Sequence, residues 1–242
     1  MPRFYALPPR TVLWPYLMVS VRQRNALFNR PFEHAILDPG ISIFKNVPEY
    51  PSGFLQRWLS IAKWTVERTN GKVWVTIPDY PDDENPGLTG DNVGKTLNNI
   101  KWFMEKDPNL PWLVVLQARY LNPFSFFESC ERTKDLLGDY GDYPRIGIGT
   151  VCKTRKLEFI EYCCRVARTV FPRAWIHAFG LTLRALPRVK NHIDSFDSSA
   201  FTFPVTPLRE GYDGIWGQAR TDSEKTVYFK RYVEHIERVL AN

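Results

Sequence analysis

The stretch NHIDSFDSSAFTFP, from Asn191 to Pro204, places two carboxylates, Asp194 and Asp197, among aromatic and small hydroxyl side chains. A carboxylate in apolar surroundings costs free energy unless a partner stabilises it or a reaction uses it. Carboxylates in such positions can attack a sugar carbon or move the proton of a leaving group. One of the two acids could be a reagent and the other structural, and these residues alone leave both assignments open.

Further polar residues fall where predicted strands end. In a (β/α) barrel the carboxyl ends of the strands form the catalytic face, so such residues would converge on one mouth. Each also has a structural explanation. Asp38 could stabilise a turn before Pro-Gly, and Asp79 could be one more loop acid. Gln117 could satisfy loop backbone groups, and His177 could be a packed histidine. Gly149 and Thr150 end a further predicted strand.

Apolar, β-branched segments alternate with amphipathic ones along the chain, which favours a parallel sheet with helical crossovers. The predicted strands are 11–21, 34–40, 72–79, 111–117, 145–151, 174–180 and 192–198. The predicted helices are 52–71, 89–107, 123–138, 156–171, 181–189 and 222–240. We predict an α/β fold, a single TIM-type (β/α)8 barrel over 1–242 in which 205–242 form a loop and helix that close it. An open doubly wound sheet is the alternative.

The net charge is +6 and the sequence pI is about 9.1, which suggests a polyanionic partner. Residues 151–190 hold nine basic side chains and two acidic ones. We interpret Lys153, Arg155, Arg184 and Arg188 as contacts to a nucleic-acid backbone, with solvated helix faces as the alternative. The four cysteines show no zinc-binding spacing, and no segment predicts a signal peptide or a membrane span. We expect reduced thiols, no metal site, no membrane association and a cytoplasmic protein.

Several segments together resemble the tRNA-guanine transglycosylases, and more closely their DNA-acting relatives, the 7-deazaguanine DNA-modification transglycosylases. LDPGIS (37–42) is similar to the Asp-Ser-Gly-Gly stretch of the tRNA enzymes, and DSFDS (194–198) to their late Phe-Asp pair. PDYPDD, VVLQ and GIGTVCK resemble the base-recognition segments in order and spacing, and HAFGL resembles the strand before the nucleophile. The similarity covers roughly residues 36–204 and implies a (β/α)8 barrel that exchanges a base.

The resemblance implies a role for each matching residue. Asp197 would be the nucleophile that attacks C1′, and Asp38 the general acid and base. Asp79 and Gln117 would bind a guanine or 7-deazaguanine base, with Gly147, Gly149 and His177 completing the pocket. The chemistry is that of retaining glycosidases and requires no cofactor.

Two departures from the tRNA enzymes shape the prediction. No cysteine follows Cys164, so the zinc-binding subdomain is absent, and SSAFTFPVTP replaces the Pro-Thr-Arg segment after the nucleophile. These differences favour DNA over tRNA as the substrate. Three alternatives remain: a metal-dependent or phosphate-binding barrel acting on a small metabolite, a non-catalytic nucleic-acid-binding barrel, and base removal without replacement.

Overall fold

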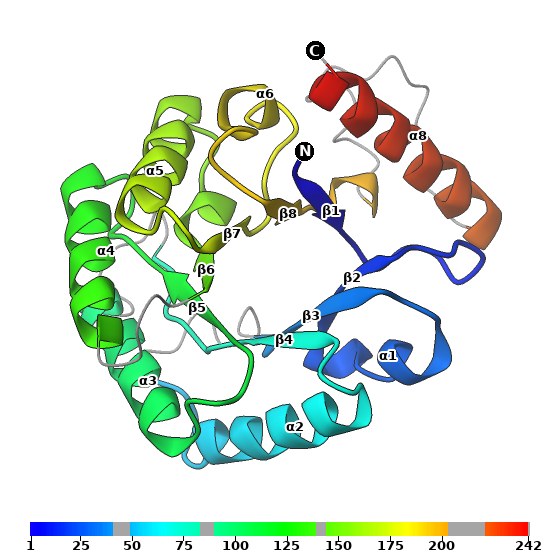
Figure 1. The fold of residues 1–242 in the computed structure, drawn as a ribbon. Helices are drawn as coiled ribbons and strands as arrows, with labels where there is room; N and C mark the ends of the chain where they lie inside the picture. The colour runs from blue at the N-terminus through cyan, green and yellow to red at the C-terminus, as the bar shows by residue number, and fades with distance from the viewer. Residues whose placement is uncertain (41–48, 83–89, 139–143, 203–220, 242) are drawn as a thin grey trace.

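Eight parallel strands form the inner ring of the fold, and helices surround them (Figure 1). The computed structural model describes residues 1–40, 49–82, 90–138, 144–202 and 221–241. The strands, given in chain order, are β1 (Arg3–Tyr5), β2 (Tyr16–Ser20), β3 (His34–Asp38), β4 (Val73–Thr76), β5 (Trp112–Leu116), β6 (Arg145–Ile148), β7 (Trp175–Ala178) and β8 (Ser195–Asp197). Their spatial order is β1-β8-β7-β6-β5-β4-β3-β2.

The ring closes between β1 and β2. Ala6, which follows β1, pairs with Leu17 in a parallel bridge. The Ala6 N–H donates to the Tyr16 carbonyl at 3.1 Å, and the Met18 N–H donates to the Ala6 carbonyl at 3.1 Å. The predicted (β/α)8 barrel is therefore confirmed, and the open-sheet alternative is wrong.

The strands bury both faces, as their apolar composition predicts. In β5, Trp112, Val114 and Leu116 join the large core between strands and helices. The intervening Leu113 and Val115 join a second cluster with Tyr5, Ile36 and Phe179. Because side chains alternate across a strand, this second cluster is the filled interior of the barrel.

The helices cover the outside of the ring (Figure 1). They are α1 (Ala26–Asn29), α2 (Phe54–Arg68), α3 (Asn92–Lys106), α4 (Pro123–Leu137), α5 (Leu157–Val170), α6 (Leu186–Val189) and α8 (Asp222–Ala241), with single turns η1 (Val21–Gln23), η4 (Thr150–Lys153) and η5 (Ala200–Thr202). Helix α8 packs Phe229 and Tyr232 on Phe4 of β1, at ring distances of 6.2 and 5.5 Å. Residues 205–220 of the predicted closing segment lie outside the described residues.

Two predicted elements need correction, and one strand was missed. The predicted strand 11–21 is shorter, because Pro15 delays it until Tyr16. The predicted helix 181–189 is confined to α6, and the segment before it forms turns such as Ala185 N–H to Thr182 O. Strand β1 was not predicted, since three residues carry little periodic signal.

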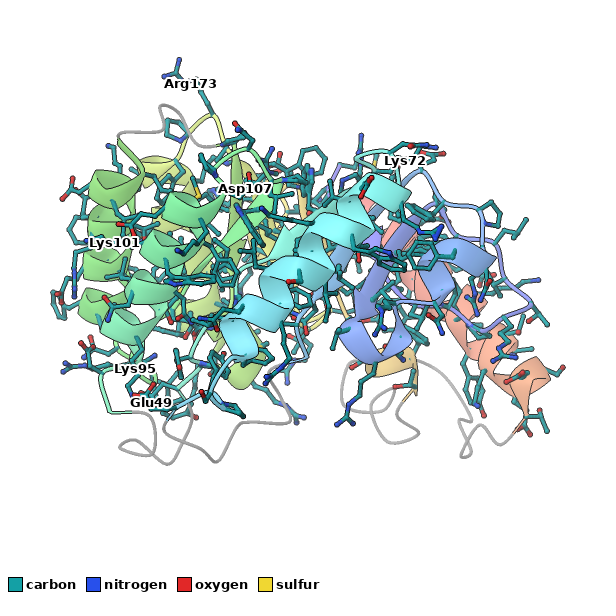
Figure 2. All side chains as sticks on the ribbon, turned by 90° about the horizontal axis from the view of Figure 1, so that it is seen from below. Glu49, Lys72, Lys95, Lys101, Asp107 and Arg173 are labelled. Carbon is teal, nitrogen blue, oxygen red and sulfur yellow. The ribbon has the colours of Figure 1, made fainter. Side chains whose placement is uncertain are left out.

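The barrel has two distinct ends (Figure 2). Glu49 and Lys95, joined by an ion pair of 2.8 Å, lie at the end where strands finish, which is the carboxyl end of the barrel. Lys72, Asp107 and Arg173, each next to the start of a strand or the end of a helix, lie at the opposite end, which is the amino end. Within the described part of the chain, no helix has the length and apolar character that crossing a bilayer requires.

Candidate functional site

Asp197 ends β8, and two N–H donors hold one of its carboxylate oxygens. The Gly180 backbone N–H donates to Oδ1 at 2.9 Å, and His177 Nε2 lies 3.2 Å from the same atom. Among the described residues, Oδ2 takes part in no hydrogen bond. The side chain is 18% exposed. Asp197 therefore presents one fixed oxygen to the protein and one oxygen available to a substrate.

A chain of hydrogen bonds beneath Asp197 favours one tautomer of His177, which is fully buried. The indole N–H of Trp175, which can only donate, reaches Ser195 Oγ at 2.7 Å. The Ser195 hydroxyl then points its own proton at His177 Nδ1, 2.9 Å away. With Nδ1 as an acceptor, neutral His177 carries its proton on Nε2 and donates it to Asp197. Three side chains thus donate in one direction, toward the carboxylate.

Asp38 ends β3 and faces the same interior as Ile36, two residues earlier. Its Oδ1 accepts a hydrogen bond from the Gly40 N–H at 2.6 Å. Burial raises the pKa of Asp38 to about 6, the Gly40 hydrogen bond opposes the rise, and the negative charge of Asp197 adds to it. The two acids therefore sense each other, and they differ: Asp38 titrates near neutral pH, while Asp197 has donors that stabilise its anion.

Asp79 and Gln117 form a buried pair beside these acids. Gln117 Nε2 donates to Asp79 Oδ2, and both side chains are at most 5% exposed. Gln117 Oε1 is buried, and no described residue hydrogen-bonds to it. A buried acceptor without a donor costs free energy, so this oxygen is suited to a ligand N–H. The pair can therefore offer acceptors to a bound molecule.

Two glycines make room for this arrangement. A Cβ on Gly149 would lie 2.2 Å from Gln117 Nε2 and 2.8 Å from Val115 Cγ1. A Cβ on Gly147 would lie 2.5 Å from Phe179 Cε2. Both positions exclude a side chain because neighbouring side chains already occupy the space. Gly149 thus determines where the Gln117 amide sits.

The sequence-predicted residues Asp38, Asp79, Gln117, His177 and Asp197 come together at the carboxyl end of the barrel. Sequence reasoning missed Tyr50, whose hydroxyl donates to the Asp79 backbone carbonyl. Burial, and then the charges of Asp79, Tyr80 and Asp38, raise the pKa of Tyr50. Its position in PEYPSG, a loop that follows β3, was the signal that could have identified it.

Asp194 lies elsewhere, because the strand predicted over 192–198 begins only at Ser195. It precedes β8, at the amino end, where it forms an ion pair with Arg168 at 2.6 Å. Its Oδ2 also accepts the Ile176 N–H at 2.7 Å. Three residues of β8 span the barrel wall, so Asp194 and Asp197 face opposite ends. Asp194 has a structural environment.

The four predicted phosphate contacts differ in their surroundings. Arg155 and Arg184 are exposed and follow η4 and β7 at the carboxyl end. Arg188 pairs with Glu158 at 3.3 Å and Glu161 at 3.5 Å, so acids of α5 already neutralise it. Lys153 ends η4, and its side chain lies outside the described residues.

In the described residues, no three His, Cys, Asp or Glu side chains are grouped closely enough to hold a metal ion. Cys130, Cys163 and Cys164 are buried free thiols, and burial raises their pKa values. Cys152, in η4, is exposed and lies beside Gly180, whose added Cβ would be 2.8 Å from Cys152 Cβ.

No protein-family model and no curated protein matches the sequence. Among solved structures, fructose-bisphosphate aldolase from Campylobacter jejuni is 12% identical, with a TM-score of 0.41 over 92% of this chain and 85% of that one. HMG-CoA lyase from Brucella melitensis is 8% identical, with a TM-score of 0.44 over 88% and 80%. The carboxyl transferase domain of Rhizobium etli pyruvate carboxylase is 10% identical, with a TM-score of 0.43 over 92% and 41%. Similarity this weak carries no argument about the reaction.

Proposed function

We propose that this protein is a base-exchange transglycosylase that replaces guanine in a nucleic acid, DNA rather than tRNA, with a 7-deazaguanine base. One observation carries the proposal: two interacting carboxylates have opposite environments. Burial raises the pKa of Asp38 to about 6, while two N–H donors stabilise the Asp197 anion. A buried carboxyl group with a raised pKa beside a hydrogen-bonded carboxylate is an arrangement found in acid and nucleophile pairs.

The exchange would take two displacements at one carbon. Asp197 Oδ2 attacks C1′ of the nucleotide, the C1′–N9 bond breaks, and its electron pair goes to the leaving guanine, which takes a proton from Asp38. The entering base then loses its N9 proton to Asp38 and attacks C1′, which releases the Asp197 carboxylate. Two inversions retain the β-configuration that a polynucleotide requires, as in retaining glycosidases.

His177 and the Gly180 N–H have a defined role in this scheme. They touch Oδ1, which becomes the carbonyl oxygen of the aspartyl-sugar ester. When the entering base displaces the ester, negative charge returns to the carboxylate, and the two donors stabilise it. They would therefore favour the second step more than the first.

The Asp79–Gln117 pair supports recognition of a guanine-like edge. That edge presents N–H donors, which match the unpartnered Gln117 Oε1 and the Asp79 carboxylate. The target nucleotide must leave its stack to reach these groups, at a cost of a few kcal/mol.

The test is base incorporation. The protein is incubated with DNA, and separately with tRNA, together with radiolabelled guanine or 7-cyano-7-deazaguanine. We expect label in DNA, and a covalent protein–DNA adduct that Asp197→Asn abolishes. Label in neither polymer, or unchanged activity of Asp197→Asn, would contradict the proposal. Abasic sites without label would indicate base removal alone.

A further inference from the structure

The first part of the chain carries an unbalanced positive charge. Residues 1–32 contain five arginines and no acid, and Glu33 is the first carboxylate in the sequence. Two of these arginines, Arg10 and Arg30, lie in the connection between β1 and β2 and after α1. Neither forms an ion pair with any described residue, in contrast to Arg188 and its two glutamates.

A surface cavity of about 550 Å³ opens between the β1–β2 connection and α1. Its polar lining consists of two guanidinium groups and three carboxamides: Arg10, Arg30, Gln23, Asn25 and Asn29. Every one of these side chains can donate hydrogen bonds, and none carries negative charge. Such a lining matches an anion with several acceptor oxygens.

Three hydrogen bonds hold two of these side chains, Arg30 and Gln23, in place. The Arg30 Nη1 group donates to the Pro8 carbonyl at 2.7 Å and to the Pro9 carbonyl at 3.4 Å, which anchors one edge of the guanidinium. The Ser20 hydroxyl donates to Gln23 Oε1 at 2.9 Å, which turns the Gln23 amide nitrogen toward other partners. Burial, and then the charge of Arg10, lowers the pKa of Arg30, so the two cations interact unfavourably without an anion.

The cavity reaches the carboxyl end of the barrel at Gln23 and extends along α1 to Arg30, which follows that helix. Gln23 lies three residues after Ser20, the last residue of β2. Ser20 is the register partner of Asp38 on the neighbouring strand. A polymer bound over Asp38 and Asp197 could therefore extend across η1 to this cavity.

We propose that the cavity between Arg10 and Arg30 binds a phosphate group, and that its occupant is a backbone phosphate of the nucleic acid held at the carboxyl end. The anion site follows from the lining itself, while the nucleic-acid occupant rests on the proposed function. Arginine recognises phosphate oxygens through its planar array of donors, which suits this role. The contact carries no sequence information and positions the strand.

The experiment measures binding of a short fluorescein-labelled single-stranded DNA by anisotropy at several salt concentrations. Arg10→Gln removes a charge from an exposed residue and keeps a polar side chain. We expect its affinity to fall about tenfold, and the salt dependence to lose roughly the 0.7 units of slope that one phosphate contact contributes. Arg132→Gln, which removes an exposed arginine of α4 that is already paired with Glu128 at 3.4 Å, is the matched control and should bind nearly as the wild type. Arg30→Lys, which keeps the charge and loses the planar fork, should weaken binding less than Arg10→Gln.

A second arm identifies the source of the phosphate. Inorganic phosphate is titrated into wild type and Arg10→Gln while thermal unfolding is followed. DNA binding that Arg10→Gln leaves unchanged would overturn the nucleic-acid assignment. If the phosphate-dependent rise in Tm is also the same in both proteins, or absent, the anion site is overturned as well. Base exchange is assayed on the same wild-type protein, and its failure together with intact Arg10-dependent binding would refute the proposed reaction and leave this site standing.

Discussion

The two ends of the barrel interior use the same strands for different purposes. At the amino end, aromatic rings meet across the lumen: Trp74 of β4 contacts Trp175 of β7 at 5.6 Å, and His34 at 4.4 Å. The Arg3 guanidinium lies 4.8 Å from the Trp175 ring and 5.0 Å from the Tyr16 ring. At the carboxyl end, the interior positions are acids and amides, and Gln117 Oε1 has no hydrogen-bond partner among the described residues. Packing of these large side chains stabilises the amino end of the barrel. That stability allows the carboxyl end to hold buried polar groups that lower the free energy of unfolding.

The sharpest form of this comparison is between Asp194 and Asp197, which lie at opposite ends of one strand. Asp197→Asn should lower the rate of base exchange at least about a thousandfold, because it removes the nucleophile. It should leave the fold intact, as near-UV circular dichroism will show. Asp194→Asn should retain activity and lower the free energy of unfolding by about 1 kcal/mol, since its ion pair is partly exposed. The reverse pattern would exchange the roles of the two acids.

His177 connects the two ends, and its removal should have the next largest effect. His177→Phe removes one donor from Asp197 Oδ1 and should lower kcat about a hundredfold, with accumulation of the covalent intermediate. Ser195→Ala leaves the imidazole in place and removes only the group that fixes its tautomer, so we expect a loss of about tenfold.

Nitrogen NMR of His177 separates this role from a purely structural one. The neutral imidazole of the wild type should show a protonated Nε2 and an unprotonated Nδ1, and that of Ser195→Ala should show a mixture of the two tautomers. A protonated Nδ1 in the wild type would contradict the directed donor chain. This measurement does not depend on any activity.

Gly149 tests how closely the carboxyl end is fitted around Gln117. Gly149→Ala would place a Cβ 2.2 Å from Gln117 Nε2, so the amide must move, and we expect a severalfold rise in KM and a loss of about 1–3 kcal/mol of stability. Gly138→Ala, at the end of α4 where nothing lies within 4 Å, is the control and should be neutral or slightly stabilising. Equal effects of the two substitutions on KM and stability would mean that an added methyl group fits beside the Gln117 amide.

Much of this architecture was predictable from the sequence, because the periodicity of apolar residues and the parallel strand topology determine it. Asp38, Gln117 and Asp197 follow or end apolar segments, and parallel strands necessarily bring their carboxyl ends together. The three-residue strand β1 was not predictable, since its pairing with β8 joins opposite ends of the chain. The donor chain through His177 depends on which side chains face each other across β7 and β8, which strand periodicity alone does not specify.

Two titrating groups, one at each end of the barrel, have pKa values shifted by burial in opposite directions. Burial raises the pKa of Asp38 from 3.8 to about 6. Burial, and then the charges of Arg3, Arg145 and His177, lower the pKa of His34 from 6.5 to about 4.

Folding therefore favours the proton on Asp38 and disfavours it on His34. Asp38 contributes stability that is complete below its unfolded pKa and is lost as pH rises through 6. His34 contributes stability that is present above pH 6.5 and is lost as pH falls toward 4.

Each contribution is at most about 3 kcal/mol, and over nearly the same pH range the two have opposite signs. These two groups together should consequently make the stability of the wild type depend only weakly on pH. Relative to wild type, Asp38→Asn should gain stability near pH 7.5 and little near pH 4, as urea unfolding at both pH values will show. His34→Phe should show the opposite trend, with its stability relative to wild type rising as pH falls. Equal stability of Asp38→Asn relative to wild type at both pH values would mean that the Asp38 carboxyl has an ordinary pKa. The carboxyl end of the barrel would then lack the free-energy cost of a buried carboxylate that distinguishes it from the amino end.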